Sequence, residues 1–414
     1  MELYVHIPFC VRKCAYCDFL SGPADEETRA AYVDALLREI RSAGAFYSRK
    51  NESGKERGRR VETVFLGGGT PSILEGEDTA RIFSALRECF FIAPDAEITM
   101  EANPGTVTRE KAEVWKACGI NRLSIGLQSA DDEELKLLGR IHTYRDFLNT
   151  WETVREAGFT NVNVDLISAV PGQTAESWEQ TLRRTAELGP GHISAYSLIV
   201  EEGTPFFEKY GEPESNGENL SVKHGDSSEE ENGGLKIAGS VFQGVWPPLP
   251  DEEEERKMYD ATLRILKEYG YHRYEISNYA KEGYECRHNL GYWERKEYLG
   301  LGLGASSLIG EHRFRNTADM NTYLSCSEKL IREEEEILSV KDQMEEFMFL
   351  GLRKTAGVTE EAFKSAFGTA VSDVYGKQIS RLKSQGLLEQ REGRIFLTER
   401  GTDISNYVFG EFLF

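Results

Sequence analysis

Three cysteines lie close together near the N-terminus, Cys10, Cys14 and Cys17, in the spacing Cys-x3-Cys-x2-Cys. The thiolate form of cysteine is a metal ligand, so this spacing favours metal ligation over three buried thiols that share a loop by chance. A structural zinc site takes four protein ligands, and the nearby fourth candidate, His6, lies inside an apolar stretch typical of a strand. Three thiolates suit an iron–sulfur cluster in which one iron is left for an exchangeable ligand, because such clusters otherwise take four cysteines.

A glycine-rich segment is the second feature with chemical potential. Gly67, Gly68 and Gly69 precede Thr70, and a backbone without side chains can approach a ligand closely. A tight turn would use the same residues. The segment matches neither the phosphate loop nor the dinucleotide-binding fingerprint, so phosphate binding of those two kinds is not predicted.

Three charged residues are further candidates for ligand binding. Glu101 and Asp165 could accept hydrogen bonds from an ammonium group or from ribose hydroxyls, although each carboxylate could equally be solvated or cap a helix. Arg140 could pair with a ligand carboxylate, or lie on the surface as an ordinary arginine.

The elements that must position these residues alternate regularly over the first two hundred positions. Short apolar runs predict strands, and amphipathic stretches between them predict helices. This alternation indicates βα units with a parallel sheet, and six units would make a partial (β/α)6 barrel of the α/β class. The predicted strands are 3–7, 61–66, 96–101, 122–127, 161–167 and 193–200, and the predicted helices are 25–46, 78–90, 109–117, 144–157 and 175–187.

The candidate residues fall at or just beyond the carboxyl ends of these strands. The cysteines follow the first strand, the glycines follow the second, and Glu101 closes the third. Gln128 closes the fourth strand, Asp165 lies in the fifth and Ile199 ends the sixth. In barrels of this type the active site is built at that end, so we expect all six segments to meet at one mouth.

Six motifs together carry a resemblance to a known superfamily: HIPFC-x3-C-x-YCDF, GGGTPS, EANPG, IGLQS, LGRIH and PGQT. Through them the chain resembles the radical S-adenosylmethionine (SAM) superfamily. Within it the chain is similar to the HemN/HemW branch, which holds oxygen-independent coproporphyrinogen III oxidases and heme chaperones. The resemblance is strong over 1–210, good over 251–330 and looser over 339–414.

The resemblance implies cofactors and the residues that hold them. In the superfamily three cysteines hold a [4Fe–4S] cluster and SAM binds the fourth iron, which implies Cys10, Cys14 and Cys17 as cluster ligands. The residues that the resemblance implies around SAM are Tyr4, Tyr16, Gly68, Gly69, Thr70, Glu101, Gln128, Arg140, Asp165 and Ile199.

Two departures from the oxidase pattern favour the heme-chaperone side of the branch. Phe19 stands where the oxidase motif has a fourth cysteine, which leaves open whether the protein is an enzyme. The segment from His288 to Trp293 reads HNLGYW, and the resemblance implies it as a heme site. Imidazole is a heme ligand, and Tyr292 with Trp293 could flank a flat macrocycle. Alternatively, His288 caps a turn while the two aromatic side chains fill the core.

The remaining chain divides into three further parts. Residues 212–250 form a predicted insertion rich in Gly, Ser and Pro, and 16 acidic against 5 basic residues lie between 201 and 260. We expect a solvated, mobile surface loop there, with a lid over the barrel as the alternative. Residues 1–211 form the barrel, residues 251–338 an α+β accessory region with the HNLGYW motif, and residues 339–414 a predicted winged-helix-like domain.

The C-terminal pattern predicts helices at 341–352, 360–367 and 371–385, followed by strands at 386–388 and 394–398. Winged-helix modules often bind DNA, but residues 339–414 carry 10 basic and 11 acidic side chains and so lack a cationic surface pattern. A packing or partner-docking role is therefore favoured for this domain.

Composition narrows the function classes further. The chain has 414 residues, and 49 Lys and Arg against 70 Asp and Glu give a formal net charge of −21. This balance argues against nucleic-acid binding and a polybasic membrane anchor, because both need clustered cations. No leader-like start and no apolar run of roughly 20 residues is present, so we expect a cytoplasmic protein without transmembrane segments.

The leading hypothesis is a heme chaperone that binds a [4Fe–4S] cluster, SAM and heme, and delivers heme to an acceptor protein. The acceptor could be membrane-associated, and the chaperone could be a homodimer. The alternative is a radical SAM enzyme for oxidative decarboxylation of coproporphyrinogen III or a related substrate. A DNA-binding redox regulator that uses the C-terminal domain is the third hypothesis.

Overall fold

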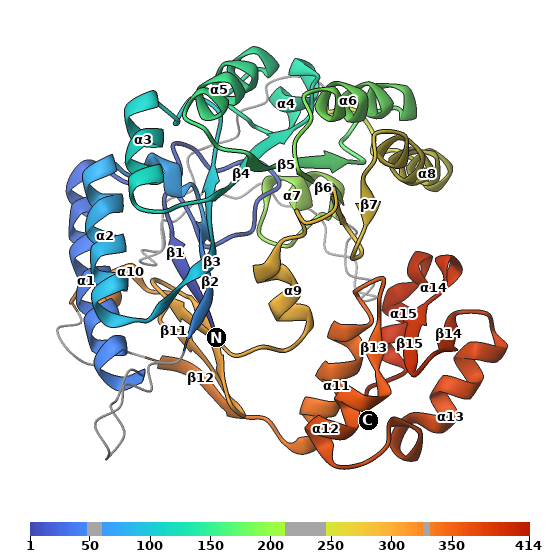
Figure 1. Ribbon diagram of the computed structural model, residues 1–414. Helices are drawn as coiled ribbons and strands as arrows, with labels where there is room; N and C mark the ends of the chain where they lie inside the picture. Colours follow the sequence, from blue (N-terminus) through green and yellow to red (C-terminus); the bar gives the residue numbers. More distant parts are fainter. Residues whose placement is uncertain (48–59, 212–245, 326–331) are drawn as a thin grey trace, which may run out of the picture.

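In the computed structural model of the protein, residues 1–47, 60–211, 246–325 and 332–414 are described. Six parallel strands lie side by side in chain order and confirm the predicted partial barrel (Figure 1). They are β1 (Glu2–Ile7), β2 (Val61–Gly68), β3 (Ile92–Ala102), β4 (Arg122–Gln128), β5 (Asn161–Ser168) and β6 (His192–Ser197).

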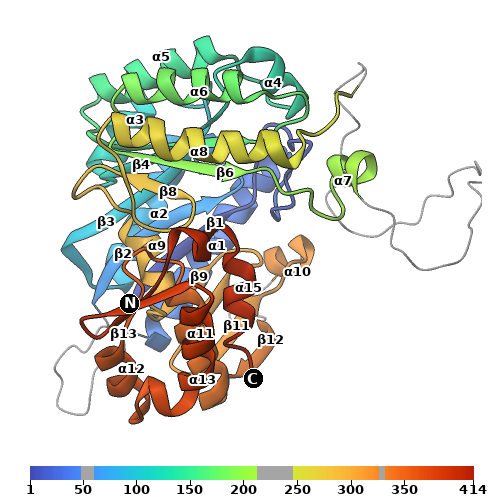
Figure 2. The same ribbon diagram turned by 90° about the vertical axis from the view of Figure 1, so that its right-hand side faces the viewer.

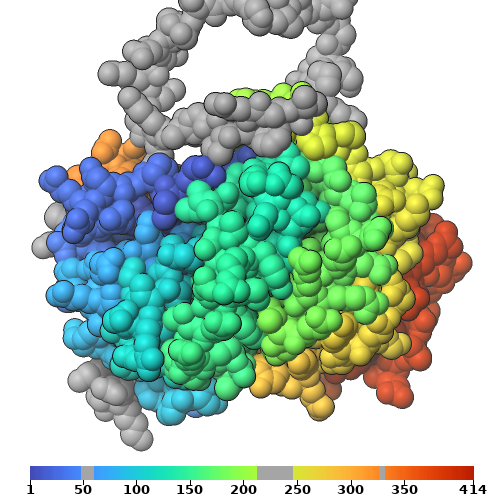
Figure 3. All heavy atoms as spheres, turned by 90° about the horizontal axis from the view of Figure 1, so that it is seen from above, coloured from blue at the N-terminus to red at the C-terminus, as the bar shows by residue number. Residues whose placement is uncertain are grey.

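The outer face of the six strands is apolar and carries the helices. Successive strand residues point to opposite faces; in β1, for example, Leu3, Val5 and Ile7 are buried in the main hydrophobic cluster. The helices form an arc outside the strands (Figure 1), and Figure 3 shows the successive units side by side in chain order. The helices of this part of the chain are α1 (Glu26–Tyr47), η1 (Pro71–Ile73), α2 (Gly76–Cys89), α3 (Arg109–Ala117), α4 (Asp132–Leu137), α5 (Tyr144–Glu156), α6 (Ala175–Glu187) and α7 (Pro205–Tyr210).

Side chains from across the helix arc fill this core. Tyr32 of α1, Phe83 of α2, Trp115 of α3 and Trp178 of α6 are all at most 1% exposed. Burying an aromatic or large aliphatic side chain contributes about 1.5–3 kcal/mol, so this outer layer fixes the strands whose inner face forms the site.

The sheet does not close into a complete barrel. Beyond β6 it continues with antiparallel strands β8 and β7, and beyond β1 it continues with β9 to β12. The accessory region thus extends both edges of the barrel sheet. Its elements are α8 (Glu252–Glu268), β7 (His272–Arg273), β8 (Asn278–Ala280), α9 (Arg287–Trp293), β9 (Tyr298–Leu301), β10 (Ser306–Ile309), β11 (His312–Asn316), α10 (Met320–Ser325) and β12 (Arg332–Ile337).

The C-terminal region has its own core and its own three-stranded sheet, in the order β13-β15-β14. Figure 2 shows it beside α9 and the accessory strands. Three helices followed by the β14–β15 hairpin give the expected winged-helix-like arrangement. The elements are α11 (Val340–Gly351), β13 (Val358–Thr359), α12 (Glu360–Phe367), α13 (Val371–Ser384), β14 (Leu388–Arg391), β15 (Arg394–Leu397), α14 (Glu399–Asp403) and α15 (Ser405–Gly410).

Two predicted strand positions were wrong. The sixth strand ends at Ser197 rather than at residue 200: the Leu198 N–H still donates to the Ser168 carbonyl of β5 at 2.9 Å, but residues 198–200 lie outside the strand. The predicted strand 386–388 begins only at Leu388, since Gly386 has a φ of +72° in the turn after α13.

Most of the predicted insertion, 212–245, lies outside the described residues. Its C-terminal flank is anchored: Gly172 donates its N–H to the Pro248 carbonyl at 2.8 Å, and the Tyr210 hydroxyl donates to the Pro247 carbonyl at 2.7 Å. Within the described part of the chain, no helix has the length and apolarity needed to cross a membrane.

Candidate functional site

The cysteine loop follows β1 at the carboxyl end of the barrel. The loop is tied back by the Cys10 N–H, which donates to the Gly22 carbonyl at 3.0 Å, and by the Ala15 N–H, which donates to the Leu138 carbonyl at 3.1 Å. Gly139 makes this second approach possible, because a Cβ there would lie 3.1 Å from the Ala15 nitrogen and its φ is +76°.

The thiols of Cys10, Cys14 and Cys17 are free and half-buried. Burial raises the pKa of Cys10, and it raises the pKa of Cys17 to about 11. Ligation of iron needs thiolates and would therefore release these protons.

The donor set fits a cluster better than a single ion. Among the described residues no three His, Cys, Asp or Glu side chains converge closely enough to hold one metal ion. In a four-iron cluster each thiolate binds its own iron, so three separated sulfurs on one loop satisfy the cluster without converging.

The triple-glycine segment brings the backbone against the cysteine loop. Gly69 donates its N–H to the Ile7 carbonyl at 2.9 Å, and Thr70 donates its N–H to the Phe9 carbonyl at 2.7 Å. A Cβ on Gly69 would lie 2.6 Å from the Phe9 oxygen, and Gly68 has a φ of +113°. The absence of side chains is therefore required for β2 to pass the loop so closely.

Two acidic side chains lie on the inner face of the barrel at this end. The Glu101 carboxylate accepts from the Gly68 N–H at 3.1 Å. Burial, with the neighbouring Asp165 carboxylate as the second cause, raises the pKa of Glu101 to about 8. Asp165 accepts from the Ser124 hydroxyl at 2.8 Å and from the Asn163 amide at 2.8 Å. The pair can receive the cationic or hydroxyl groups of a ligand.

Arg140 lies against the cysteine loop. Its Nη1 donates to the sulfur of Cys14 at 3.6 Å, and its Nη2 donates to Asn103 Oδ1 at 2.6 Å and to the Gly126 carbonyl at 2.8 Å. Tyr16 lies within hydrogen-bonding reach of the same guanidinium. The guanidinium is therefore held by at least four polar groups and is not a free surface cation.

The remaining predicted SAM residues are arranged as follows. Tyr4 lies on β1, where its hydroxyl is hydrogen-bonded to His6 Nδ1 at 3.0 Å. Gln128 sits at a bulge in β4 with a φ of +72°, an unfavourable conformation for a residue with a side chain. Ile199 follows β6 and is 68% exposed. Gln128 and Ile199 lie at or beyond the carboxyl ends of β4 and β6, whereas Tyr4 lies at mid-strand.

The HNLGYW segment lies at the opposite end of the barrel, which we call the floor. It forms α9, which contacts β2 and α11 (Figure 1). His288 stacks on Phe65 of β2, with ring centroids 5.1 Å apart, and its Nδ1 lies 3.9 Å from the Glu2 carboxylate at the start of β1. At about 3.3 Å per residue the five steps from Glu2 to Ile7 span roughly 17 Å, so α9 and the cysteine loop are separated by the length of the barrel.

Both ring nitrogens of His288 are occupied. Nδ1 is hydrogen-bonded to the Thr63 hydroxyl at 2.7 Å, and Nε2 is hydrogen-bonded to the Tyr292 hydroxyl at 3.0 Å. The side chain is 2% exposed, and burial with the nearby Arg122 cation lowers the pKa of His288 to about 3. Trp293 stacks against the Arg353 guanidinium, 4.5 Å from the ring centroid, at the boundary with the C-terminal region.

Sequence reasoning missed the partners of α9. Glu97 of β3 accepts hydrogen bonds from the N–H groups of Arg287 and His288, both at 3.1 Å, and from the thiol of Cys286 at 3.6 Å. A Cβ on Gly291 would overlap the Glu2 carboxylate. No sequence signal links these residues, because Glu97 and α9 are about 190 positions apart.

Sequence reasoning also left Asn103 without a role, although it was part of the EANPG motif. Its side chain contacts both Arg140 and Thr70.

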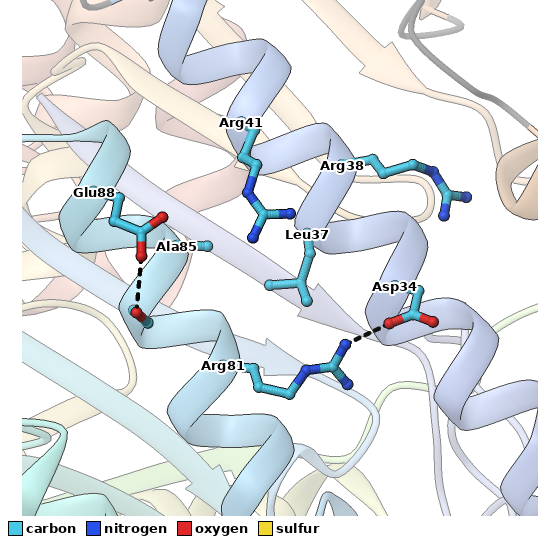
Figure 4. Close-up of a pocket in the computed structure, with 8 residues that line it drawn as sticks. Asp34, Leu37, Arg38, Arg41, Arg81, Ala85 and Glu88 are labelled. Carbon is cyan, nitrogen blue, oxygen red and sulfur yellow. Dashed lines mark hydrogen bonds and ion pairs between the residues drawn. The ribbon is translucent and has the colours of Figure 1, made fainter.

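A surface groove of about 430 Å³ lies between α1 and α2, outside the barrel (Figure 4). Arg38, Arg41 and Arg81 line it together with Asp34 and Glu88. Arg81 pairs with Asp34 at 2.5 Å, and the Arg38 guanidinium donates to the Leu324 carbonyl at 3.1 Å. The groove lies on the helix layer, away from the strand ends that carry the candidate residues.

Comparison with known proteins agrees with this geometry. The radical SAM superfamily matches residues 4–185, and the HemN C-terminal domain matches residues 338–404. The solved structure of coproporphyrinogen III oxidase (HemN) from Escherichia coli has the same fold, with a TM-score of 0.78 at 24% identity, covering 99% of this chain and 89% of that one. A partial α/β barrel with the Cys-x3-Cys-x2-Cys loop at its mouth makes this chain a radical SAM protein.

Full-length relatives define the family within that class. The chain is 34% identical over 410 residues to the heme chaperone HemW of Lactococcus lactis subsp. lactis, covering 99% of this chain and 96% of that protein. It is 35% identical over 419 residues to HemW of Bacillus subtilis, covering 99% and 98%. The chain belongs to the HemW family.

Proposed function

We propose that this protein is a heme chaperone that holds a [4Fe–4S] cluster on Cys10, Cys14 and Cys17, binds SAM and heme, and hands heme to an acceptor protein. Two facts support the proposal. Two relatives that match along almost the whole chain are named heme chaperones, and the cysteine loop carries three thiols without a fourth, since Phe19 stands at the next position of the motif.

The proposed SAM site is the barrel mouth. Gly68, Gly69 and Thr70 would meet the amino-acid end of the ligand, because their backbone is free of side chains beside the cysteine loop. When bound, the cluster and SAM would supply one-electron chemistry, and the protein supplies binding and orientation. The further residues of this proposed site are Tyr4, Tyr16, Glu101, Gln128, Arg140, Asp165 and Ile199.

For heme, we propose His288 with Tyr292 and Trp293, on the condition that α9 leaves the barrel floor. In the described conformation neither imidazole nitrogen has a free lone pair or N–H for an added group, since Thr63 and Tyr292 take both. Heme ligation by His288 would therefore have to break the Tyr292 contact or the Thr63 contact. This condition makes heme binding and the position of α9 mutually dependent.

Within the structure, the observation that carries the cofactor part of the proposal is the loop of three half-buried thiols held against a side-chain-free backbone at the barrel mouth. The test is anaerobic hemin titration of cluster-loaded protein followed by absorbance, and then mixing with a heme-free acceptor hemoprotein. A saturable Soret change near one heme per chain, followed by transfer to the acceptor, is expected. Absence of specific heme binding to cluster-loaded protein would refute the chaperone role.

The second candidate function is oxygen-independent decarboxylation of coproporphyrinogen III or a related substrate. The shared fold with HemN, over 99% of this chain, is the observation that favours this second function. Anaerobic incubation with SAM, a reductant and coproporphyrinogen III, followed by product analysis, separates the two functions. Product above the level without protein would support the enzyme, and none would reject it for this substrate.

We further propose a cytoplasmic location, and a division into the barrel (1–211), the insertion (212–250), the accessory region (251–338) and the C-terminal domain (339–414). The separate hydrophobic core of the last region supports its boundary. The shared sheet between barrel and accessory region predicts that those two unfold together.

A further inference from the structure

Two of the three loop sulfurs receive hydrogen bonds from side chains outside the loop. The Thr70 hydroxyl donates to the sulfur of Cys10 at 3.5 Å, and the Arg140 guanidinium donates to the sulfur of Cys14 at 3.6 Å. Thr70 follows β2 and Arg140 follows α4, so the two donors reach the loop from different parts of the barrel.

One side chain joins these two donors. Asn103 Oδ1 accepts from Arg140 Nη2 at 2.6 Å, and Asn103 Nδ2 donates to the Thr70 hydroxyl oxygen at 2.7 Å. A hydroxyl has a single hydrogen. Because Thr70 accepts from Asn103, its own hydrogen is left to point at Cys10. We call this set of three residues the Arg140–Asn103–Thr70 chain.

The surroundings hold Asn103 in place. Its backbone N–H donates to the Ser72 hydroxyl at 3.2 Å, and its carbonyl accepts from the Thr106 hydroxyl at 2.8 Å. Gly126 provides the space for the contact with Arg140, because a Cβ there would lie 2.9 Å from Asn103 Oδ1 and 3.2 Å from Arg140 Nη2. The amide therefore has one orientation that satisfies both of its neighbours.

We propose that Asn103 is a positioning residue that directs the Thr70 and Arg140 hydrogens at two cluster sulfurs and thereby raises the reduction potential of the cluster. This inference rests on the proposed cluster site. Hydrogen bonds to the sulfurs are one of the levers that set the potential of an iron–sulfur cluster, and a nearby cation favours the more negative, reduced state. The role is separate from the contact with SAM proposed above for Arg140.

The test is the midpoint potential of the cluster in anaerobically reconstituted protein without SAM, followed by the EPR signal of the reduced state. Asn103→Leu removes both the acceptor and the donor at similar volume. It is expected to lower the ratio of reduced to oxidised cluster at a fixed potential about tenfold, which corresponds to a shift of ~59 mV in the midpoint potential of a one-electron couple. Thr70→Val is expected to shift the potential in the same direction by a smaller amount.

A matched control separates this role from a general loss of packing. Asn121 also bridges two groups, since its Oδ1 accepts from the Ile98 N–H at 2.9 Å and its Nδ2 donates to the Ala96 carbonyl at 2.8 Å, but it lies at the start of β4. Asn121→Leu should lower the free energy of unfolding and leave the potential unchanged. If Asn121→Leu shifts the potential as far as Asn103→Leu does, the inference is wrong.

A double-mutant cycle tests whether Asn103 acts through Thr70. In the Thr70→Val background the effect of Asn103→Leu on the potential should be smaller than in the wild type, and an equal effect would overturn the positioning role.

If Asn103→Leu takes up no cluster, Asn103→Asp replaces it. That side chain has no donor, so the Thr70 hydroxyl would turn from Cys10 to the new carboxylate, and an unchanged potential would again overturn the inference. Failure of the wild type itself to hold a cluster would refute the proposed function instead.

Discussion

The two ends of the barrel use the same six strands in opposite ways. At the mouth, the backbone is stripped of side chains at Gly68 and Gly69, and the Cys10, Cys14 and Cys17 thiols are free and half-buried. At the floor, α9 fills the end of the barrel, and both nitrogens of its histidine are hydrogen-bonded. The mouth is where we propose that the ligand binds, whereas the floor is already filled by the chain itself.

The comparison shows that a residue of a metal-binding type is not always available to bind a ligand. His288 and the mouth cysteines are equally good metal ligands by type. A cysteine sulfur that accepts a hydrogen bond from Thr70 or Arg140 can still bind iron, but both nitrogens of the His288 imidazole are taken by Thr63 and Tyr292, inside a floor that also contains Glu2. In the described conformation the HNLGYW motif therefore serves structure, because its imidazole has no free nitrogen for a ligand.

The largest expected effect is the loss of the proposed cluster from the barrel mouth, with the floor left intact. Cys14→Ala removes one of three proposed cluster ligands, and reconstituted protein should lose nearly all cluster-bound iron, because the neighbouring thiols cannot supply a replacement. Cys286→Ala is the matched control at the floor, where the thiol contacts Glu97. Iron and sulfide content per chain is the measurement. Equal losses in the two variants would remove the distinction between the ends.

The pH dependence of stability involves both ends. Burial raises the pKa of Glu2 at the floor to about 8, and burial with Asp165 raises the pKa of Glu101 at the mouth to about 8. At these two groups the folded protein binds more protons than the unfolded chain between about pH 4.5 and 8. The contribution of each group to the free energy of unfolding should therefore fall as pH rises through this interval, by on the order of 1 kcal/mol per pH unit, and level off above it.

Glu2→Gln should remove the Glu2 share of this dependence and leave the share of Glu101, with an effect of a few kcal/mol near pH 8. Denaturant unfolding of the metal-free chain at pH 5, 6.5 and 8 measures it. Glu62→Gln on the adjacent strand is the control and should keep the full dependence. A Glu2→Gln variant with the wild-type slope would show that the floor carboxyl is ionised when folded.

The next effect is steric and specific to the floor. Gly291→Ala places a Cβ against the Glu2 carboxylate and should lower the free energy of unfolding by about 1–3 kcal/mol. Gly376→Ala is the matched control, since Gly376 lies inside α13 and a Cβ there meets nothing within 4 Å. That variant should be stabilised by about 0.5–1 kcal/mol. Denaturant unfolding compares the two, and equal stability would mean that α9 is not seated as described.

The smallest effect tests whether the floor competes with heme. Tyr292→Phe removes the hydrogen bond to His288 Nε2 and should cost about 1 kcal/mol of stability. If His288 ligates heme after α9 moves, the same change should increase hemin affinity about fivefold, because the competing bond is gone. Tyr298→Phe, whose ring packs on Tyr292 4.8 Å away, is the control. Unchanged hemin affinity in Tyr292→Phe would assign His288 a purely structural role.

Local patterns predicted the barrel well. The apolar runs located all six parallel strands, and the helices 109–117 and 175–187 coincide with α3 and α6. These elements can be recognised from short stretches of sequence, because a buried strand is a short β-branched run and an amphipathic helix has a 3.6-residue period. Strands β7 and β8 were not predicted, since segments of two and three residues leave no periodicity to detect.

Contacts between distant segments could not be predicted in this way. Strand ends in the sequence located the cysteine loop, the triple glycine, Glu101 and Gln128 at the mouth. No local pattern indicated that Asn103 joins Thr70 to Arg140, or that Glu2 and Glu97 meet α9. These contacts join residues between about 30 and 290 positions apart and depend on the register of the assembled sheet.

The most direct test of the account is the effect of SAM on the EPR spectrum of the reduced cluster in anaerobically reconstituted wild-type protein. Three thiol ligands leave one iron of a four-iron cluster without a protein ligand, so the account predicts about four irons per chain and a spectrum that changes when SAM is added. A cluster whose spectrum is unaffected by SAM, or protein that assembles no four-iron cluster, would contradict the assignment of the barrel mouth as the cofactor site.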